Sequence, residues 1–203
     1  MIAALMAKNW NVVLLTTKSA RFFTDQEEYW VPEEKLDDIE APLFCSFKDE
    51  DEYTTWCKEG DPVLHISLIR LADCMLIAPM SANSLGKITS GIADNIILQV
   101  FKGWPYRKEE NGEWLIKKAC IIAPAMNTAM LENPTTEKLL KIASEQMLLT
   151  VMPTQKKVLM CGGAAGYGAM ASVEDMVEQV GLGIQRLVDR RAKDKELLDA
   201  AAA

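Results

Sequence analysis

Histidine is nearly absent from this sequence, since His65 is the only one among 203 residues. A site built from several histidines, whether a metal centre or a proton-transferring pair, is therefore excluded, and we predict no metal site. Cysteine is also scarce, and its positions are Cys45, Cys57, Cys74, Cys120 and Cys161. Their number is odd and no CxxC pair occurs, so the sequence predicts neither a zinc ribbon nor a disulfide framework. This pattern is typical of reduced thiols in a cytosolic or nuclear protein.

Long apolar runs and an excess of positive charge are missing as well. No stretch approaches the roughly 20 apolar residues that a membrane-spanning helix needs. The chain has 22 Lys and Arg against 29 Asp and Glu, a net charge of −7, which is the wrong sign for a protein that grips a nucleic-acid backbone. Residues 1–7 lack the basic segment of a secretory signal, so we expect a cytoplasmic protein.

What remains is the composition of a folded domain, with 49% hydrophobic and 25% charged residues. At this length one sizeable core is expected, so we predict a single domain over residues 1–203. Its core spans about residues 10–180, and a charged C-terminal helix covers residues 181–203.

Strand patterns alternate with helical patterns along the whole chain. Strands are predicted at residues 11–17, 41–47, 74–79, 119–124 and 148–152. Helices are predicted at residues 1–7, 19–23, 49–57, 62–71 with Asp61 as N-cap, 84–101, 134–145 and 173–198. Residues 25–40 are predicted to form an acidic loop. This alternation predicts an α/β fold with a doubly wound parallel sheet, flavodoxin-like or Rossmann-like. In that architecture ligands bind beyond the carboxyl ends of the strands.

Two predicted strands end in the same way, with Ala-Pro followed by small residues and an asparagine. The two segments are residues 77–83 (IAPMSAN) and 122–127 (IAPAMN). Small residues let a flat ligand approach the backbone, and Ser or Asn at a helix start adds hydrogen bonds. Each asparagine taken alone is a helix N-cap. Because the pattern occurs twice, it favours a crevice between two facing loops.

A third unusual segment, residues 161–171, has four glycines among eleven residues. We interpret it as a mobile lid, because a plain linker would carry more serine or charge. By itself Cys161 is an incidental thiol, and only its place beside the glycines indicates a proton donor or nucleophile. Similarly, His65 lies on an apolar helix and is by default a partly buried structural histidine.

These segments, in this order, resemble the FMN-dependent cysteine decarboxylase family. The matching segments are residues 62–66, 78–95, 124–130 and 161–171. The resemblance implies FMN as cofactor and decarboxylation of 4′-phosphopantothenoylcysteine to 4′-phosphopantetheine in coenzyme A biosynthesis. In this chemistry the thiol is oxidised to a thioaldehyde, CO₂ is lost, and the resulting enethiol is reduced. The resemblance also implies a homotrimer, with the predicted helix at residues 84–101 as a contact element.

The resemblance further implies a role for each matching residue. His65 corresponds to the base or orienting group of the oxidative step, and Cys161 to the acid that protonates the enethiol. The implied FMN contacts are Ser19, Ser81, Ala82, Asn83, Ser84 and Ala125. The implied substrate contacts are Asn127, Met160, Gly162 and Met170.

The sequence departs from the family pattern in two places. Family members open with a strand and a Gly-Ser loop that binds the FMN phosphate, and neither occurs in these 203 residues. We expect that the chain is shortened there, because loss of a central strand would expose the edges of its neighbours. In the glycine-rich segment the usual Asp is missing, and Met170 lies nine residues after Cys161, one more than in the family pattern.

Two other functions stay open from the sequence. Fungal relatives include non-catalytic subunits that inhibit a type 1 protein phosphatase, but these carry long acidic tails, whereas residues 189–199 are mixed in charge. Other family members decarboxylate peptidyl cysteine. The resemblance of residues 61–65 and 125–130 to the enzymes of the small substrate favours phosphopantothenoylcysteine.

Overall fold

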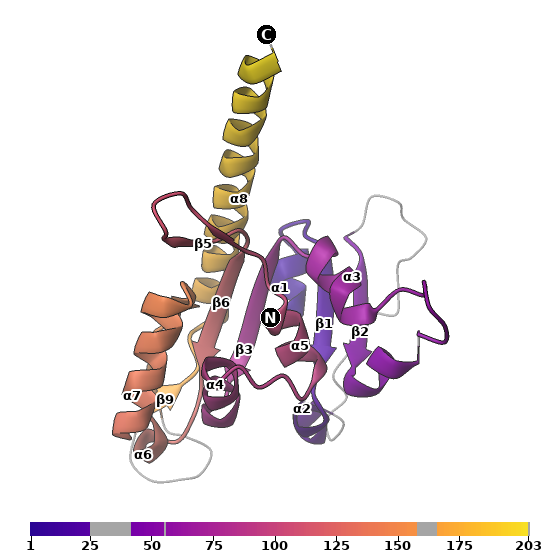
Figure 1. The fold of residues 1–203 in the computed structure, drawn as a ribbon. Coiled ribbons are helices and arrows are strands. Elements are labelled where there is room, and N and C mark those ends of the chain that lie inside the picture. Colours follow the sequence, from indigo (N-terminus) through magenta and orange to yellow (C-terminus); the bar gives the residue numbers. More distant parts are fainter. Residues whose placement is uncertain (25–41, 55, 158–165, 203) are drawn as a thin grey trace. The chain divides into compact units, whose positions relative to one another are not determined.

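The computed structural model describes residues 1–24, 42–54, 56–157 and 166–202, in an α/β arrangement (Figure 1). These residues fall into two compact units. The first unit joins Met1–Leu71 to Gly91–Gly103, and the second joins Ala72–Ser90 to Trp104–Ala203. Parallel strands connected by helices occur in both, which confirms the predicted class. The predicted acidic loop at residues 25–40 lies outside the described residues.

The first unit contains a parallel pair of strands and four short helices. Its elements are α1 (Ile2–Met6), β1 (Val12–Thr16), α2 (Lys18–Thr24), β2 (Phe44–Lys48), the 3₁₀ turn η1 (Asp49–Tyr53), α3 (Leu64–Leu71) and α5 (Ile96–Lys102). β1 pairs with β2 from Val12 opposite Phe44 to Thr16 opposite Lys48. Helix α5 contacts both β1 and α3, so buried Ile96 and Leu68 belong to the core of this unit.

The second unit is built on three parallel strands. The strands are β3 (Cys74–Met80), β6 (Ala119–Pro124) and β7 (Thr150–Val151), with β6 in the middle. Two antiparallel hairpins flank them, β4 (Tyr106–Lys108) with β5 (Trp114–Ile116), and β8 (Gln155–Lys157) with β9 (Gly166–Ala169). The helical elements are α4 (Ala82–Thr89), α6 (Thr128–Leu131), α7 (Pro134–Lys141), the π-helical turn η2 (Ile142–Gln146) and α8 (Val173–Ala202).

Helix α8 covers the strands β3 and β6 with its first half. Met176 and Val180 of this helix are buried, and Gly183 lies so close to the sheet that an added Cβ would stand 2.7 Å from Ala119 Cβ. The second half of α8 extends past the end at which β6 begins (Figure 1). None of the helices in the described ranges is long and apolar enough to cross a membrane.

The long helix predicted at residues 84–101 is wrong, because the chain forms two helices there. α4 ends at Thr89, Gly91 has φ +74°, and α5 begins at Ile96. The side chain of Asn95 accepts a hydrogen bond from the N–H of Leu98 at 3.0 Å and so caps a new helix. The helix proposed as a trimer contact therefore does not exist as one element.

Asp61 was predicted to cap the helix at residues 62–71, and this prediction is wrong. Its carboxylate instead accepts hydrogen bonds from the main-chain N–H groups of Cys57 and Lys58, both at 2.9 Å, and closes a separate turn. Helix α3 begins only at Leu64. The predicted helix at residues 49–57 is also shorter than expected, since only the 3₁₀ turn η1 forms.

Candidate functional site

The loop after β3 leads directly into helix α4, and Ser81 marks the border. Its hydroxyl accepts a hydrogen bond from the N–H of Ser84 and donates one to the Ser84 hydroxyl, both at 3.1 Å. Asn83 is exposed, while Ala82 and Ser84 are half-buried. The first turn of α4 thus presents two hydroxyl groups and an amide beside a methyl-sized side chain.

The loop after β6 is held against the end of β3. The N–H of Ala125 donates to the carbonyl of Met80 at 3.0 Å, which joins the two strand-end loops. Asn127 follows and caps α6, since its side-chain oxygen accepts from the N–H of Ala129 at 2.9 Å. The structure therefore brings the Ser81–Ser84 segment and the Ala125–Asn127 segment to one edge of the second unit.

The hairpin of β8 and β9 closes onto the same loop. Met126 donates its N–H to the carbonyl of Gly168 at 2.9 Å, and the Thr128 hydroxyl donates to the carbonyl of Tyr167 at 2.7 Å. The fit is tight, because a Cβ on Gly168 would stand 2.2 Å from Met126 O and one on Gly166 would stand 2.3 Å from Thr128 Oγ1. Three segments that are far apart in the sequence thus meet through main-chain hydrogen bonds.

This arrangement corrects part of the predicted lid. Residues 166–169 are not a mobile loop but a strand, and Gly168 reaches φ +130°, a conformation that only glycine adopts easily. Met170 follows this strand and is half-buried. Cys161, Met160 and Gly162 lie outside the described residues, and so does the rest of the predicted lid up to residue 165.

His65 lies on α3 in the first unit and is bound by a residue that the sequence did not single out. Nδ1 of the imidazole is 2.5 Å from Oε1 of Glu52, and the other oxygen of that carboxylate accepts from the His65 main-chain N–H at 3.1 Å. Glu52 is only 7% exposed. No spacing rule links a 3₁₀ turn to a helix thirteen residues later, so only the abundance of acids near residue 50 could have drawn attention to it.

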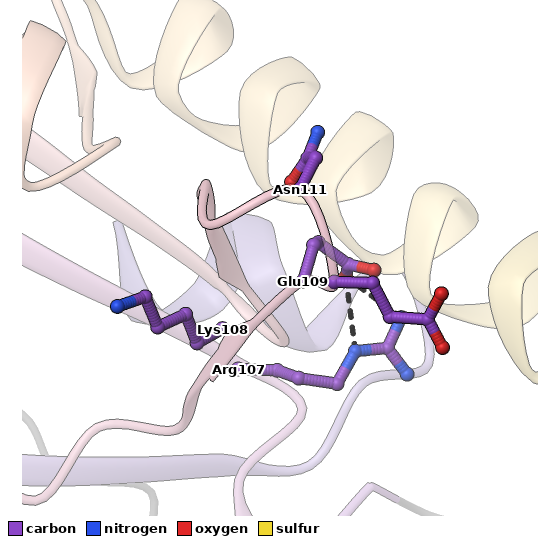
Figure 2. Close-up of a pocket in the computed structure, with 5 residues that line it drawn as sticks. Arg107, Lys108, Glu109 and Asn111 are labelled. Carbon is purple, nitrogen blue, oxygen red and sulfur yellow. Dashed lines mark hydrogen bonds and ion pairs between the residues drawn. The ribbon is translucent and has the colours of Figure 1, made fainter.

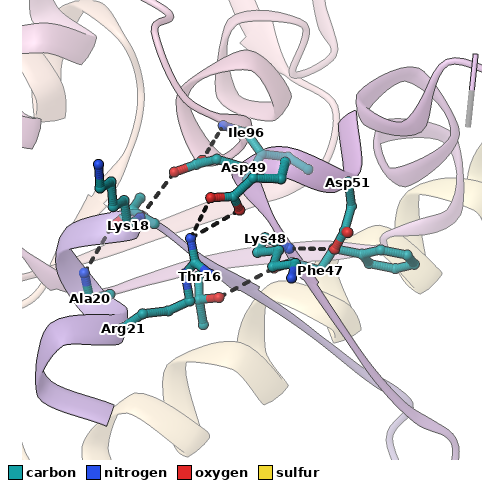
Figure 3. A network of polar contacts seen from close by, with 11 residues as sticks. Thr16, Lys18, Ala20, Arg21, Phe47, Lys48, Asp49, Asp51 and Ile96 are labelled. Atoms are coloured by element: carbon teal, nitrogen blue, oxygen red, sulfur yellow. Dashed lines mark hydrogen bonds and ion pairs between the residues drawn. The ribbon is translucent and has the colours of Figure 1, made fainter. Parts of the chain in front are cut away.

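Ser19 lies on α2, also in the first unit, and its side chain is exposed. The start of this helix is fixed by Asp49, whose carboxylate accepts from the N–H of Lys18 and from the N–H of Ile96, each at 3.0 Å (Figure 3). One carboxylate therefore caps both α2 and α5. Arg21 on the same helix forms two hydrogen bonds with exposed Glu50, at 2.7 and 2.9 Å.

A hollow on the β4–β5 hairpin carries no predicted site residue. It is lined by Arg107, Lys108, Glu109, Glu110 and Asn111 (Figure 2). Its ion pair, Arg107 with Glu109 at 2.9 Å, is exposed, and such pairs contribute little energy. We interpret the hollow as the gap between long surface side chains.

Two of the described cysteines, Cys74 and Cys120, have largely buried thiols that are poor nucleophiles. Burial, with a smaller contribution from Asp73, raises the pKa of Cys74 to about 12. Burial also raises the pKa of Cys120 far above its ordinary value. Exposed Cys45 and Cys57 are unpaired thiols, and the described residues contain no cluster of acids, cysteines and histidine that could hold a metal ion.

The strand-end edge of the second unit fits a flat, polar ligand. Hydroxyl and amide groups stand at a helix start, where free N–H groups favour acceptor atoms. Ala82 and Ala125 are half-buried and carry only a methyl group, so no long side chain at these two positions would keep a ring from the backbone. Hydrogen-bond donors and acceptors around a small-residue surface are what a heterocyclic cofactor requires.

Comparison with known proteins gives a consistent result. The family model described as "Flavoprotein" matches residues 1–183. A phosphopantothenoylcysteine decarboxylase from Arabidopsis thaliana is 46% identical over 137 residues, which are 67% of this chain and 60% of that protein. This chain thus spans less than two thirds of that relative's length.

Two solved structures are also similar. One is a cysteine-to-serine mutant of PPC decarboxylase complexed with pantothenoylaminoethenethiol, with 36% identity and a TM-score of 0.67, covering 89% of this chain and 91% of the other. The second is the FMN binding protein AtHal3, with 39% identity and a TM-score of 0.63, covering 84% of this chain and 80% of the other. The shared architecture agrees with the flavodoxin-like α/β fold predicted from the sequence.

Proposed function

Because the chain belongs to the flavoprotein family, we propose that it catalyses the FMN-dependent decarboxylation of 4′-phosphopantothenoylcysteine to 4′-phosphopantetheine, a step of coenzyme A biosynthesis. The observation that carries the proposal is the meeting of three segments in the second unit, through the hydrogen bonds of Ala125 to Met80 and of Met126 to Gly168. These are the segments to which the family resemblance assigns cofactor and substrate. The similarity to a PPC decarboxylase over most of the chain supports the same substrate.

The proposed FMN contacts are the residues to which the family resemblance assigns this role: Ser19, Ser81, Ala82, Asn83, Ser84 and Ala125. The hydroxyls of Ser81 and Ser84 and the amide of Asn83 can exchange hydrogen bonds with the polar edge of the ring, and the alanines can lie against its face. FMN held by these residues would supply the two-electron redox chemistry that decarboxylation of the substrate thiol requires.

The remaining residues act on the substrate. Asn127 binds the carboxylate that is lost, and Met170 contacts the bound molecule. The family resemblance assigns substrate contacts to Met160 and Gly162 as well. His65 takes the proton of the substrate thiol in the oxidative step. Cys161 donates a proton when the enethiol is reduced.

The activity is tested with FMN-loaded protein and 4′-phosphopantothenoylcysteine, by measuring released CO₂ and the mass of the thiol product. We expect CO₂ release with the wild type, no oxidation with His65→Asn, and accumulation of the enethiol with Cys161→Ser. Cys57→Ser is the matched control, because it removes an exposed thiol from a turn. If the FMN-loaded wild type releases no CO₂, the proposal is refuted. If it releases CO₂ only from a peptide that ends in cysteine, the substrate is peptidyl cysteine rather than 4′-phosphopantothenoylcysteine.

Two further properties belong to this proposal. The first is a homotrimer, which rests on the family resemblance and which sedimentation equilibrium or light scattering tests directly. The second is a cytoplasmic location, which is supported by the unpaired state of Cys45, Cys57, Cys74 and Cys120. Fractionation of the source cells tests it.

A further inference from the structure

The carboxylate of Glu52 binds the single histidine at two points. One oxygen accepts from the main-chain N–H of His65 at 3.1 Å, and the other lies 2.5 Å from the ring nitrogen Nδ1. Glu52 is 7% exposed and is the only acidic side chain among the described residues that is buried. A buried carboxylate is costly unless donors satisfy it, so the two contacts account for its position.

These contacts constrain where the imidazole carries its proton. An ionised carboxylate has no hydrogen to donate, so the nitrogen facing it must be the donor. A neutral ring then has its hydrogen on Nδ1 and its lone pair on Nε2. Within the described part of the chain Nε2 has no hydrogen-bond partner, and the histidine side chain is 26% exposed. The basic nitrogen is thus the one that remains accessible.

We propose that Glu52 is a positioning residue that holds His65 with Nδ1 protonated and Nε2 available as the base. The proposal rests on the proposed function for its catalytic part. The substrate S–H proton moves to Nε2, which leaves a thiolate and an imidazolium. The carboxylate next to Nδ1 then balances the new positive charge, so the proton transfer does not leave an unpaired cation.

The nearby acid Glu50 gives a matched control. It belongs to the same 3₁₀ turn, but it is exposed and pairs with Arg21 rather than with His65. Glu52→Gln keeps the shape of the side chain and replaces one acceptor oxygen by an NH₂ group. If the amide oxygen of the new glutamine still accepts the hydrogen bond from the main-chain N–H of His65, its NH₂ group faces Nδ1 and donates to it. The ring hydrogen must then lie on Nε2.

The first readout is the tautomer of the imidazole, measured by long-range ¹H–¹⁵N NMR at about pH 9, where an imidazole is neutral. Because the chain has one histidine, its signals need no assignment. We expect the Nδ1–H form in the wild type and in Glu50→Gln, and the Nε2–H form in Glu52→Gln. An Nε2–H ring in the wild type would overturn the proposal, and this measurement needs neither a variant nor activity.

The second readout is kinetic. Loss of a correctly oriented base lowers rates by about 10² to 10⁴, so we expect kcat of Glu52→Gln to fall about 100-fold or more, with KM and FMN binding changed little. Glu50→Gln should keep kcat within about twofold. If the wild type is active and Glu52→Gln matches it, the positioning role is refuted. If the wild type is inactive but shows the Nδ1–H ring, only the proposed reaction fails.

Discussion

Replacing Gly168 by alanine should detach the β8–β9 hairpin from the loop after β6. The new Cβ would stand 2.2 Å from Met126 O, about 1 Å closer than an ordinary carbon–oxygen contact. The strand must move away, which breaks the 2.9 Å hydrogen bond from Met126 N–H to Gly168 O. A lost hydrogen bond costs about 1 kcal/mol, overpacking about 2, and an alanine at φ +130° about 1. Together these contributions predict a loss of about 4 kcal/mol in the free energy of unfolding.

The control for this change is Gly112→Ala in the β4–β5 hairpin of the same unit. Gly112 also has a positive φ, +88°, but nothing lies within 4 Å of an added Cβ. Only backbone strain of about 1 kcal/mol is expected there. The two variants therefore separate the collision with Met126 from the conformational preference of glycine.

Two measurements test the prediction. If the hairpin unfolds with the rest of the unit, the free energy of unfolding in urea should fall by about 3 kcal/mol more in Gly168→Ala than in Gly112→Ala. If it opens on its own, the Met126 amide should exchange with D₂O roughly 1,000-fold faster than in the wild type, since about 4 kcal/mol is nearly three factors of ten at 1.4 kcal/mol each. Equal stability of the two variants, together with unchanged exchange at Met126, would refute the reasoning.

Three further outcomes follow from contacts in the two units. Asp49→Asn leaves one acceptor oxygen for the two main-chain N–H groups at the starts of α2 and α5, so the free energy of unfolding in urea should fall by about 1 to 2 kcal/mol. An unchanged free energy of unfolding would mean that these two hydrogen bonds are dispensable. The pKa of Cys74 is raised to about 12 by burial, so the folded chain keeps a proton that the unfolded chain releases above about pH 9. The free energy of unfolding should therefore fall as pH rises from about 9 toward 12, with a loss of about 1.4 kcal/mol at about pH 10. Cys74→Ser should remove this contribution to the pH dependence of the free energy of unfolding. Trp104 is buried and donates its indole N–H to Lys118 O at 2.8 Å, so Trp104→Phe should cost about 2 kcal/mol in thermal or urea unfolding, and a change under 0.5 would contradict this.

The parallel strands of the fold were the part most readable from the sequence, whereas the short strands of the two hairpins were not predicted. Residues 119–124 form β6 at the predicted bounds, because a fully buried parallel strand reads as a continuous apolar run. The helix at residues 84–101 was misread for the opposite reason. Apolar residues continue at helical spacing through Gly91, yet Ile92 is 48% exposed whereas Ile88 and Ile96 are buried. Gly91 and the capping residue Asn95 were visible signals of the break, and they outweigh periodicity.

The contacts that assemble the candidate site could not be predicted. The joins at Met80 and at Gly168 are made by main-chain groups, which every residue carries and no side-chain pattern reveals. The Glu52 contact depends on how a 3₁₀ turn packs against α3. By contrast, the strand ends were predictable as the location of Ser81 and Asn127, because the carboxyl ends of parallel strands share one edge.

The first unit is not one continuous stretch of chain, since Met1–Leu71 needs Gly91–Gly103 to complete it. During synthesis this unit cannot finish folding when residue 71 leaves the ribosome, because α5, whose start Asp49 caps, is made about thirty residues later. The strand β3 and the helix α4 of the other unit emerge before that helix. The first unit is therefore completed only after part of the second has been made, and no single cut in the chain yields either of them whole.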